Sequence, residues 1–443
     1  MLKGKCTKFL TFQISKEPGV IEAWQRDGAW REEAYFQWRG SGEKVYSHPR
    51  DGTRWQDKKG NHERTVMLQL YSDDVRHAGS SSRSTKDHNI CHAYVTVMNV
   101  PAAALRKVGT YWTHHLSFGG DYAKDEEGKQ WGTAMKELDL LCKDGIVLAD
   151  GNWWEVKLFV LTGDQMELNK RAGLMYAFGG RYVDRYSFIS REVRKTATQV
   201  QTLIEGISEK RTPAAAENDT VLMEEGTNAR GTERRPLLNN VHGYNVFEEG
   251  ATAPCPGHDL HTGVFKKDMG SAILCWVQKK WITLSEASDC INEFKLLLRG
   301  KDESNYLGEC NLKKVSGEIT IPGNMIQSRT LVRFLPLVMR KMLINFPMAE
   351  NHCSWKLIQL MCQLQRGFQS FAVSESQRVK LDNVYKKYMH EKMALDAELK
   401  EMIGKDEGAG NSVICKHVTV LHYSDLIAAL GPLANYSTYV QEC

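Results

Sequence analysis

The chain has 443 residues, and its 58 Lys and Arg nearly balance its 54 Asp and Glu, so the formal net charge is only +4. This charge does not identify a nucleic-acid binder by itself, although a basic groove can exist within a balanced total. The length allows two or three domains, or one domain with a large insertion. Because no uninterrupted apolar stretch is long enough to span a bilayer, we expect no membrane association.

The cysteines point to a reducing compartment. The chain has 11 of them without a Cys-x-x-Cys pair, and no apolar signal-peptide core follows Met1. Disulfides are rare inside cells, where thiols stay reduced. We therefore expect an intracellular protein with buried thiols.

Residues 1–64 show only weak periodicity, and we expect a poorly defined N-terminal segment there. The pattern then sharpens into three short apolar runs, each bounded by polar residues or Pro101. These runs predict strands. They are TVMLQLY (65–71), CHAYVTVMNV (91–100) and YWTHHLSF (111–118).

A helix and a buried strand follow. In residues 131–145, apolar side chains recur every three or four positions and Gly145 closes the run, which predicts an amphipathic helix. Residues 153–164 are almost continuously apolar, as in a strand that is buried on both faces, and they end at Asp164. Residues 165–178 predict a second helix.

This order of elements is that of an RNase H-like fold, an α/β fold with a mixed sheet. The first predicted strand runs into Asp73 and Asp74, and the central one ends at Asp164. An acidic pair at a strand end is most simply a solvated turn. In an RNase H-like sheet, however, the first and central strands are neighbours, so Asp73 and Asp164 would meet at one edge.

The second half of the chain is predicted to be mostly helical. Residues 206–240 lack apolar periodicity and predict a linker or exposed loop. Apolar stripes in residues 357–364 and 381–388 predict bundle core. Lys386, Lys387 and Lys392 alternate with acidic residues, which is typical of a solvated helix face.

Clustered carboxylates repel one another unless a cation neutralises them. Mg²⁺ and Mn²⁺ prefer oxygen ligands, and two such ions can clamp the attacking and leaving oxygens of a phosphoryl transfer. Asp73 and Asp164 therefore indicate nuclease or strand-transfer chemistry with Mg²⁺ or Mn²⁺. A third carboxylate is needed, and composition alone does not select it.

The C-terminal stretch CKHVTVLHYSDLIAALGPLANYSTYVQEC (415–443) resembles a segment of the CACTA-like transposases of animals, members of the DDE superfamily with an RNase H-like fold. In that family the segment continues to the third catalytic acid, and the resemblance implies Glu442 for this role. Because Cys443 follows directly, we expect a C-terminally truncated and partly degenerate relative.

Four other segments resemble the same family in the same order. LQLYSDDV and LTGDQMELNKRAGL match the strands that carry the first two catalytic acids, and HNICHAYVTVMNVP matches the second strand. APCPGHDLHTGV matches a Cys-x-x-His element, in which Cys255 and His258 are the implied pair. From the residues alone, Cys255 and His258 are more simply part of a loop, and His422 on the strand-like run VTVLHY is more simply a core histidine.

The resemblance implies a metal-binding triad of Asp73, Asp164 and Glu442, with Asp74 as the alternative to Asp73. It further implies double-stranded DNA at transposon ends as the partner, a nuclear location, and allows a homo-oligomer. Two departures favour an inactive relative. The turn after the first acids differs from the family's Asn-Pro-Leu-Gly, and Asp184 and Ser187 replace a Cys-x-x-Cys pair, so a structural zinc of that kind cannot form there.

Two hypotheses from different classes remain open. The first is a metal-dependent transposase that cuts and joins DNA, and the second is a catalytically inactive transposon-derived protein that binds nucleic acid or acts as a scaffold. The predicted organisation is an N-terminal segment, the first part of an RNase H-like core, a linker, a mostly helical insertion and a return to the core. The bounds of these parts are 1–64, 65–205, 206–240, 241–410 and 411–443.

Overall fold

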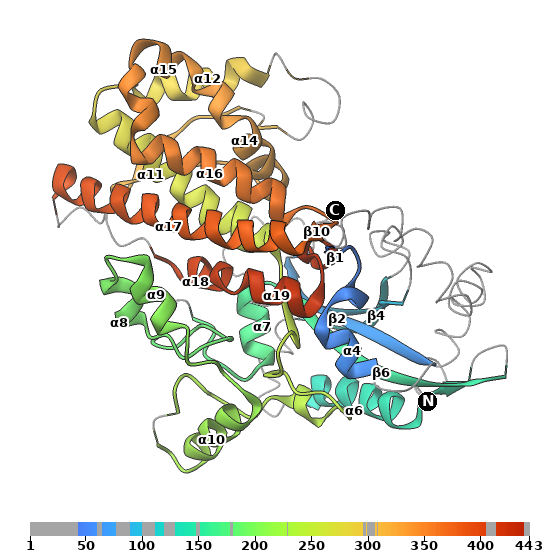
Figure 1. The fold of residues 1–443 in the computed structure, drawn as a ribbon. Helices are drawn as coiled ribbons and strands as arrows, with labels where there is room; N and C mark the ends of the chain where they lie inside the picture. Colours follow the sequence, from blue (N-terminus) through green and yellow to red (C-terminus); the bar gives the residue numbers. More distant parts are fainter. Residues whose placement is uncertain are drawn as a thin grey trace.

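The structure of the protein is a computed structural model, drawn in Figure 1. It describes residues 43–59, 64–76, 89–99, 111–118, 129–147, 151–177, 180–227, 229–295, 298, 306–307, 309–404 and 413–437. A mixed sheet occupies one part of the molecule and a group of helices the other, with α18 and α19 between them. A single hydrophobic core continues through both parts.

The main sheet has six strands in the order β4-β3-β2-β6-β5, and β7 also pairs with β6. The pairs β2–β3 and β3–β4 are antiparallel, whereas β2–β6 and β6–β7 are parallel. The predicted strands are thus confirmed, and the first extends beyond its prediction to Arg76. The strands are β2 (Thr65–Arg76), β3 (Asn89–Val97), β4 (Tyr111–Phe118), β5 (Ile146–Val147), β6 (Trp153–Gly163) and β7 (Thr252–Pro254).

The middle of the sheet is fully buried. Leu158, Val160 and Leu161 of β6 are at most 1% exposed, as are Leu68 and Leu70 of β2. Their continuous burial explains why β6 reads as an unbroken apolar run, since a strand covered on both faces needs no polar alternation.

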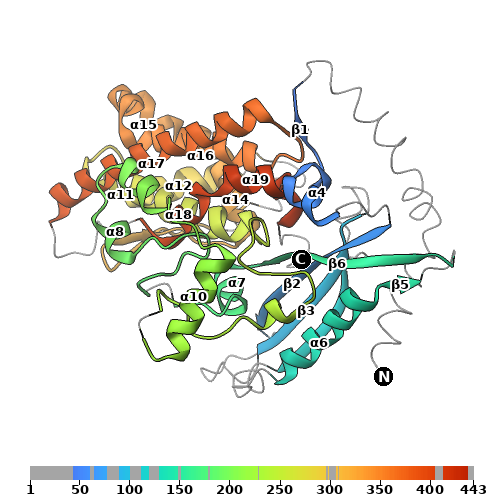
Figure 2. The same cartoon turned by 60° about the horizontal axis from the view of Figure 1, so that its bottom comes forward.

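Helices cover both faces of this sheet. Figure 2 shows α6 (Lys129–Asp144) on one side and α4 (Thr53–Lys59) on the other. On the α6 side, Arg171 of α7 (Gln165–Arg171) lies over the ring of Trp131 of α6, 3.6 Å from its centre. The helix predicted over 165–178 is shorter than expected, because Gly173 has φ +69° and breaks the α-helical conformation.

The second part is helical, as predicted. Its long helices pack around α11, and both predicted apolar stripes face this core: Leu357 and Met361 of α16 are buried, as are Leu381 and Tyr385 of α17. The helices are α11 (Phe265–Gln278), α12 (Leu284–Lys295), α14 (Met325–Val338), α15 (Arg340–Asn345), α16 (Cys353–Phe368), α17 (Glu375–Ile403), α18 (Cys415–Leu421) and α19 (Tyr423–Leu430).

Three segments differ from the predictions. Residues 206–240, predicted to be a linker or exposed loop, contain α10 (Pro213–Glu224), which begins with the cap Thr212 and a proline and follows α8 (Arg191–Thr196) and α9 (Val200–Gly206). Residues 43–59, part of the segment predicted to be poorly defined, form a short strand and α4. The run VTVLHY, predicted to be strand-like, belongs to α18 and the start of α19. Its residues are all buried, and periodicity cannot separate a helix from a strand in a fully buried run.

Lys392 is a further correction. This lysine was predicted to lie on a solvated helix face, yet its side chain is fully buried. Its ammonium group forms an ion pair with Asp396 one turn further along α17 and lies 3.7 Å from Asp268 of α11. A buried charge requires such partners.

Candidate functional site

Asp73 and Asp164 come from neighbouring parallel strands at equivalent positions. The pairing of β2 with β6 places Tyr71 opposite Thr162, and both chains continue by two residues to reach these aspartates. Both side chains are half-buried. The predicted meeting of the two carboxylates at one sheet edge therefore agrees with the observed register.

A third predicted residue continues this row. β7 is parallel to β6 and pairs Pro254 with Gly163, so Cys255, the next residue, stands beside Asp164. Cys255 is 1% exposed. His258 is half-buried in a π-helical segment, Gly257–Val264, and its backbone oxygen accepts a hydrogen bond from Lys416 Nζ at 2.8 Å. Asp73 lies within β2, two residues beyond its last pair with β6, whereas Asp164 and Cys255 directly follow β6 and β7, so the three residues form one row across the parallel strands.

Aromatic side chains surround Asp73. The hydroxyl of Tyr71 donates a hydrogen bond to Asp73 Oδ2 at 2.7 Å. His92 pairs with Asp73 across the β2–β3 ladder, and the ring of Tyr71 stacks on that of Tyr94. One carboxylate oxygen of Asp73 is therefore already oriented by a neutral donor on its own strand.

Asp164 has a structural role as well. It is the N-cap of α7, and its Oδ1 accepts a hydrogen bond from the backbone N–H of Glu167 at 2.7 Å. A carboxylate at this position is stabilised by the helix dipole. Within the described residues Oδ2 of Asp164 accepts no hydrogen bond, so one oxygen remains for another ligand.

A buried ion pair within α7 links this helix to β2 behind the row. Glu167 and Arg171 of α7 are paired, and the hydroxyl of Ser72 in β2 donates to Glu167 Oε1 at 2.6 Å. Burial would raise the pKa of Glu167, but the adjacent Arg171 outweighs burial and the pKa is lowered. Gly163 allows the two strands to approach closely here, because a Cβ at this position would lie only 2.6 Å from the backbone oxygen of Ser72.

The remaining predicted acids lie outside this description. Glu442 is not among the described residues, and of Asp74 only the backbone, in β2, is described. Within the described residues, no third acidic, histidine or cysteine side chain joins Asp73 and Asp164 closely enough to form a metal-binding group. The third ligand of the predicted triad is thus left open.

The residues that replace the Cys-x-x-Cys pair form a buried hydrogen-bonded cluster. Asp184 Oδ2 accepts hydrogen bonds from the Ser187 hydroxyl at 2.5 Å and from His422 Nε2 at 3.1 Å, and Lys210 donates to the other ring nitrogen of His422. Burial would raise the pKa of Asp184, but His422 and Ser187 bring it down to about 2. The prediction that His422 is a core histidine is confirmed.

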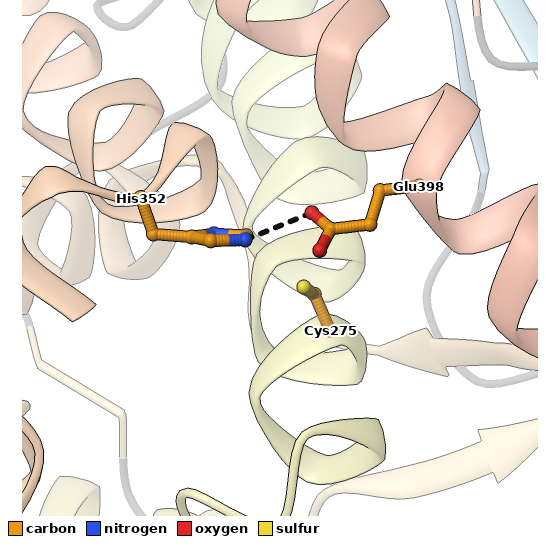
Figure 3. Close-up of side chains that lie close together, drawn as sticks. All are labelled: Cys275, His352 and Glu398. Atoms are coloured by element: carbon orange, nitrogen blue, oxygen red, sulfur yellow. Dashed lines mark ion pairs between the residues drawn. The ribbon is translucent and has the colours of Figure 1, made fainter. Parts of the chain in front are cut away.

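Sequence reasoning missed a group of possible metal ligands in the helical part, Cys275, His352 and Glu398 (Figure 3). Their ligand atoms lie within 4.8 Å of one another. These residues come from α11, the start of α16 and α17, so no motif spacing in the sequence could reveal them.

The protonation states of His352 and Cys275 disfavour metal binding at this group. Nδ1 of His352 caps α16 by accepting a hydrogen bond from the N–H of Ser354 at 3.2 Å, so Nε2 carries the proton and donates it to Glu398 at 2.8 Å. Lys279 lies 2.5 Å from the other oxygen of Glu398. Burial raises the pKa of Cys275 to about 12, which keeps it a thiol. We interpret this group as a hydrogen-bonded interhelical contact.

Comparison with protein families and with curated proteins identifies no relative of this chain. A scan against protein-family models gives no match, and a search of curated proteins gives none either. Among the described residues, no helix is both long enough and apolar enough to cross a membrane.

Proposed function

We propose that the chain is a transposase-like protein whose RNase H-like fold derives from metal-dependent DNA cleavage and strand transfer. The strand order supports the fold. In β4-β3-β2-β6-β7, three antiparallel strands are followed by two that run parallel to the first of them. The pairing of β2 with β6 is the one expected from the sequence, whereas β7 was not predicted. The helical region between β7 and α18 then corresponds to the predicted insertion.

The observation that carries the proposal is the position of Asp73 in β2 beside Asp164, which directly follows β6. Two adjacent carboxylates repel each other, and a divalent cation removes that repulsion. Oδ2 of Asp164 and the carboxylate of Asp73 are oxygen ligands of the type that Mg²⁺ and Mn²⁺ prefer. Once bound, the metal would supply Lewis-acid activation of a phosphate oxygen and of the attacking water or hydroxyl.

The two aspartates would orient the metal. Asp164 is held by the first turn of α7 and Asp73 by the hydroxyl of Tyr71, so neither side chain needs to be ordered when a cation arrives. Glu442 stays the proposed third ligand. Duplex DNA at transposon ends is the proposed substrate, and the nucleus is the proposed location.

An inactive, transposon-derived nucleic-acid-binding or scaffold protein is the second candidate. The cluster of Asp184, Ser187 and His422 favours it, because hydrogen bonds occupy the place where the resembling family carries a Cys-x-x-Cys pair. A structure that is held by hydrogen bonds at this point can keep its fold without the ancestral chemistry.

Metal binding distinguishes the two candidates. We expect saturating Mn²⁺ to raise the melting temperature of the wild-type protein by mass action. Asp73→Asn and Asp164→Asn should each abolish this rise, and Asp164→Asn is a clean test because Asn caps a helix as well as Asp does. Asp382→Asn, which alters an ion pair with Lys386 in α17, is the matched control.

Activity and DNA binding are then measured separately. Mn²⁺-dependent nicking of duplex DNA that is lost in Asp164→Asn supports the enzyme. An unshifted melting curve with Mn²⁺ contradicts the enzyme proposal. In that case, DNA affinity that falls steeply with salt would support the inactive binder. A chain that neither responds to Mn²⁺ nor binds DNA contradicts both.

A further inference from the structure

A cavity of about 520 Å³ lies beside the start of α18. Its lining comes from α8, the π-helical segment Gly257–Val264, α11, β9 (Glu318–Thr320), the end of α17 and the start of α18. The volume falls within the usual range of small-molecule sites, roughly 300 to 1,000 Å³. Asp73 and Asp164 are not among its lining residues, although Lys416 of the lining donates a hydrogen bond to the backbone oxygen of His258.

The cavity is strongly basic. Its lining includes six basic side chains and only two acidic ones, Glu318 and Asp396. Both acids are already paired, Glu318 with Lys267 at 3.1 Å and Asp396 with the buried Lys392. Glu318 therefore neutralises only Lys267 among the six, and the excess of positive charge favours an anionic ligand. The basic residues are Arg191, Arg194, Lys195, Lys266, Lys267 and Lys416.

Arg194 is the most informative of these residues. Its side chain is only 4% exposed, yet within the described part of the chain its Nε and Nη2 have no hydrogen-bond partner and it forms no ion pair. Two other buried arginines are compensated: Arg171 pairs with Glu167, and Arg211 donates to the backbone oxygens of Asp184 and Arg230. A buried guanidinium without a counter-charge is costly, so an anion bound in the cavity would stabilise Arg194.

The cavity also has an apolar side. Leu274 of α11 and Leu399 of α17 line it, together with four other aliphatic residues, Ile319, Ile321, Val413 and Ile414. A simple inorganic anion would leave this surface in contact with water. A ligand that combines charge with an apolar group would cover it and gain from the burial.

We propose that this cavity binds an organic phosphate with two or more phosphate groups beside an apolar moiety, the chemical class to which nucleoside triphosphates belong. The planar guanidinium of Arg194 matches the geometry of a phosphate, and Lys195 and Lys266 add charge around it. The DNA backbone is disfavoured as the source of the phosphates, because duplex binding spreads its contacts over many phosphates along an open surface.

Calorimetry with ATP, tripolyphosphate and AMP tests the proposal on the full chain. ATP should bind, tripolyphosphate more weakly because it lacks the apolar part, and AMP more weakly still because it has one phosphate. Arg194→Gln should weaken ATP binding by about tenfold or more, the usual loss for a charged hydrogen bond. Arg235→Gln, an exposed arginine paired with Glu217 and Glu224, is the control that should bind ATP normally.

Stability gives a second readout. Because Arg194 has no partner among the described residues, Arg194→Gln should keep or raise the melting temperature of the free protein while losing the rise that ATP produces. Lys195→Gln, at an exposed position of α8, should reduce ATP affinity without any effect on folding. Absence of ATP binding, or unchanged binding by Arg194→Gln, overturns the proposal. Displacement of ATP by duplex DNA also overturns it and assigns the cavity to backbone phosphates.

Discussion

Nε2 of His417 in α18 lies 2.9 Å from Oδ2 of Asp268 in α11, and neither side chain is exposed to solvent. The same carboxylate accepts a hydrogen bond from the hydroxyl of Tyr388, and Lys392 lies nearby. Three helices thus converge on one buried charge. Burial would raise the pKa of Asp268, but Lys392 and His417 lower it, so the group is a carboxylate in the folded protein.

Removing this charge should destabilise the fold. Asp268→Asn leaves the ammonium of Lys392 with one fewer partner, and we expect a loss of about 3 to 5 kcal/mol, typical of breaking a buried ion pair. Urea unfolding measures it. Asp382→Asn, in a partly exposed pair with Lys386 on α17, should cost less than about 1 kcal/mol. Equal losses for the two variants would contradict the role of Asp268.

Asp184 predicts a dependence of stability on pH. Its pKa is lowered from 3.8 to about 2, so the folded protein binds fewer protons here than the unfolded chain. Its contribution, about 2 kcal/mol, should be complete above the unfolded value and lost as the pH falls from there towards the folded value. Unfolding curves at about pH 5 and about pH 3 measure the loss.

Two variants separate the causes of this dependence. Asp184→Asn should remove this component of the acid sensitivity, because the group no longer titrates. Ser187→Ala removes only one of the hydrogen bonds to the carboxylate and should reduce the component without abolishing it. Identical pH profiles for the wild type and Asp184→Asn would show that this carboxyl group is not perturbed.

The interpretation of His352 as a helix cap also makes a prediction. His352→Asn should be more stable than His352→Ala by about 1 kcal/mol, because Asn provides the cap acceptor that Ala lacks. Added zinc or a chelator should not move the melting temperature of the wild type. If zinc stabilises the protein and both variants lose that response alike, Cys275, His352 and Glu398 form a metal site instead.

Two helical glycines should respond to alanine with opposite signs. A Cβ on Gly270 of α11 would lie 2.2 Å from the backbone oxygen of Ile319, so Gly270→Ala should destabilise by about 1 to 3 kcal/mol. Gly132 of α6 has open space around the same position, and Gly132→Ala should stabilise by about 1 kcal/mol. Thermal unfolding of both variants checks the contrast, and a stabilised Gly270→Ala would show that α11 and β9 are not packed this tightly.

The sequence allowed the sheet to be predicted because its signals are local. Apolar runs define β2 and β6 directly, and their order in the chain was sufficient to expect Asp73 beside Asp164. The burial of Lys392 was not predictable in this way. Its acidic partner on another helix, Asp268, is distant in sequence, and a lysine that alternates with acids on one helix face looks solvated.

The helix α10 was missed for a related reason. Its sequence carries little amphipathic signal, and the region is fixed by ion pairs such as that of Arg230 with Asp219. Periodicity detects apolar faces, whereas such ion pairs depend on residues that come together only in the folded chain. The basic cavity was not predictable for the same reason, since its basic side chains come from segments that are separate in the sequence.

The contact of residues 43–59 with α19 affects how the chain folds during its synthesis. Gly52 approaches α19 so closely that a Cβ there would lie 2.0 Å from the backbone oxygen of Ala429, and β1 (Val45–Tyr46) pairs with β10 (Val373–Ser374). Residues near the start of the described chain thus find their partners only after almost all of it has left the ribosome. During synthesis α4 can already cover β6, but the surface of α4 that packs against α19 stays uncovered until α19 is made.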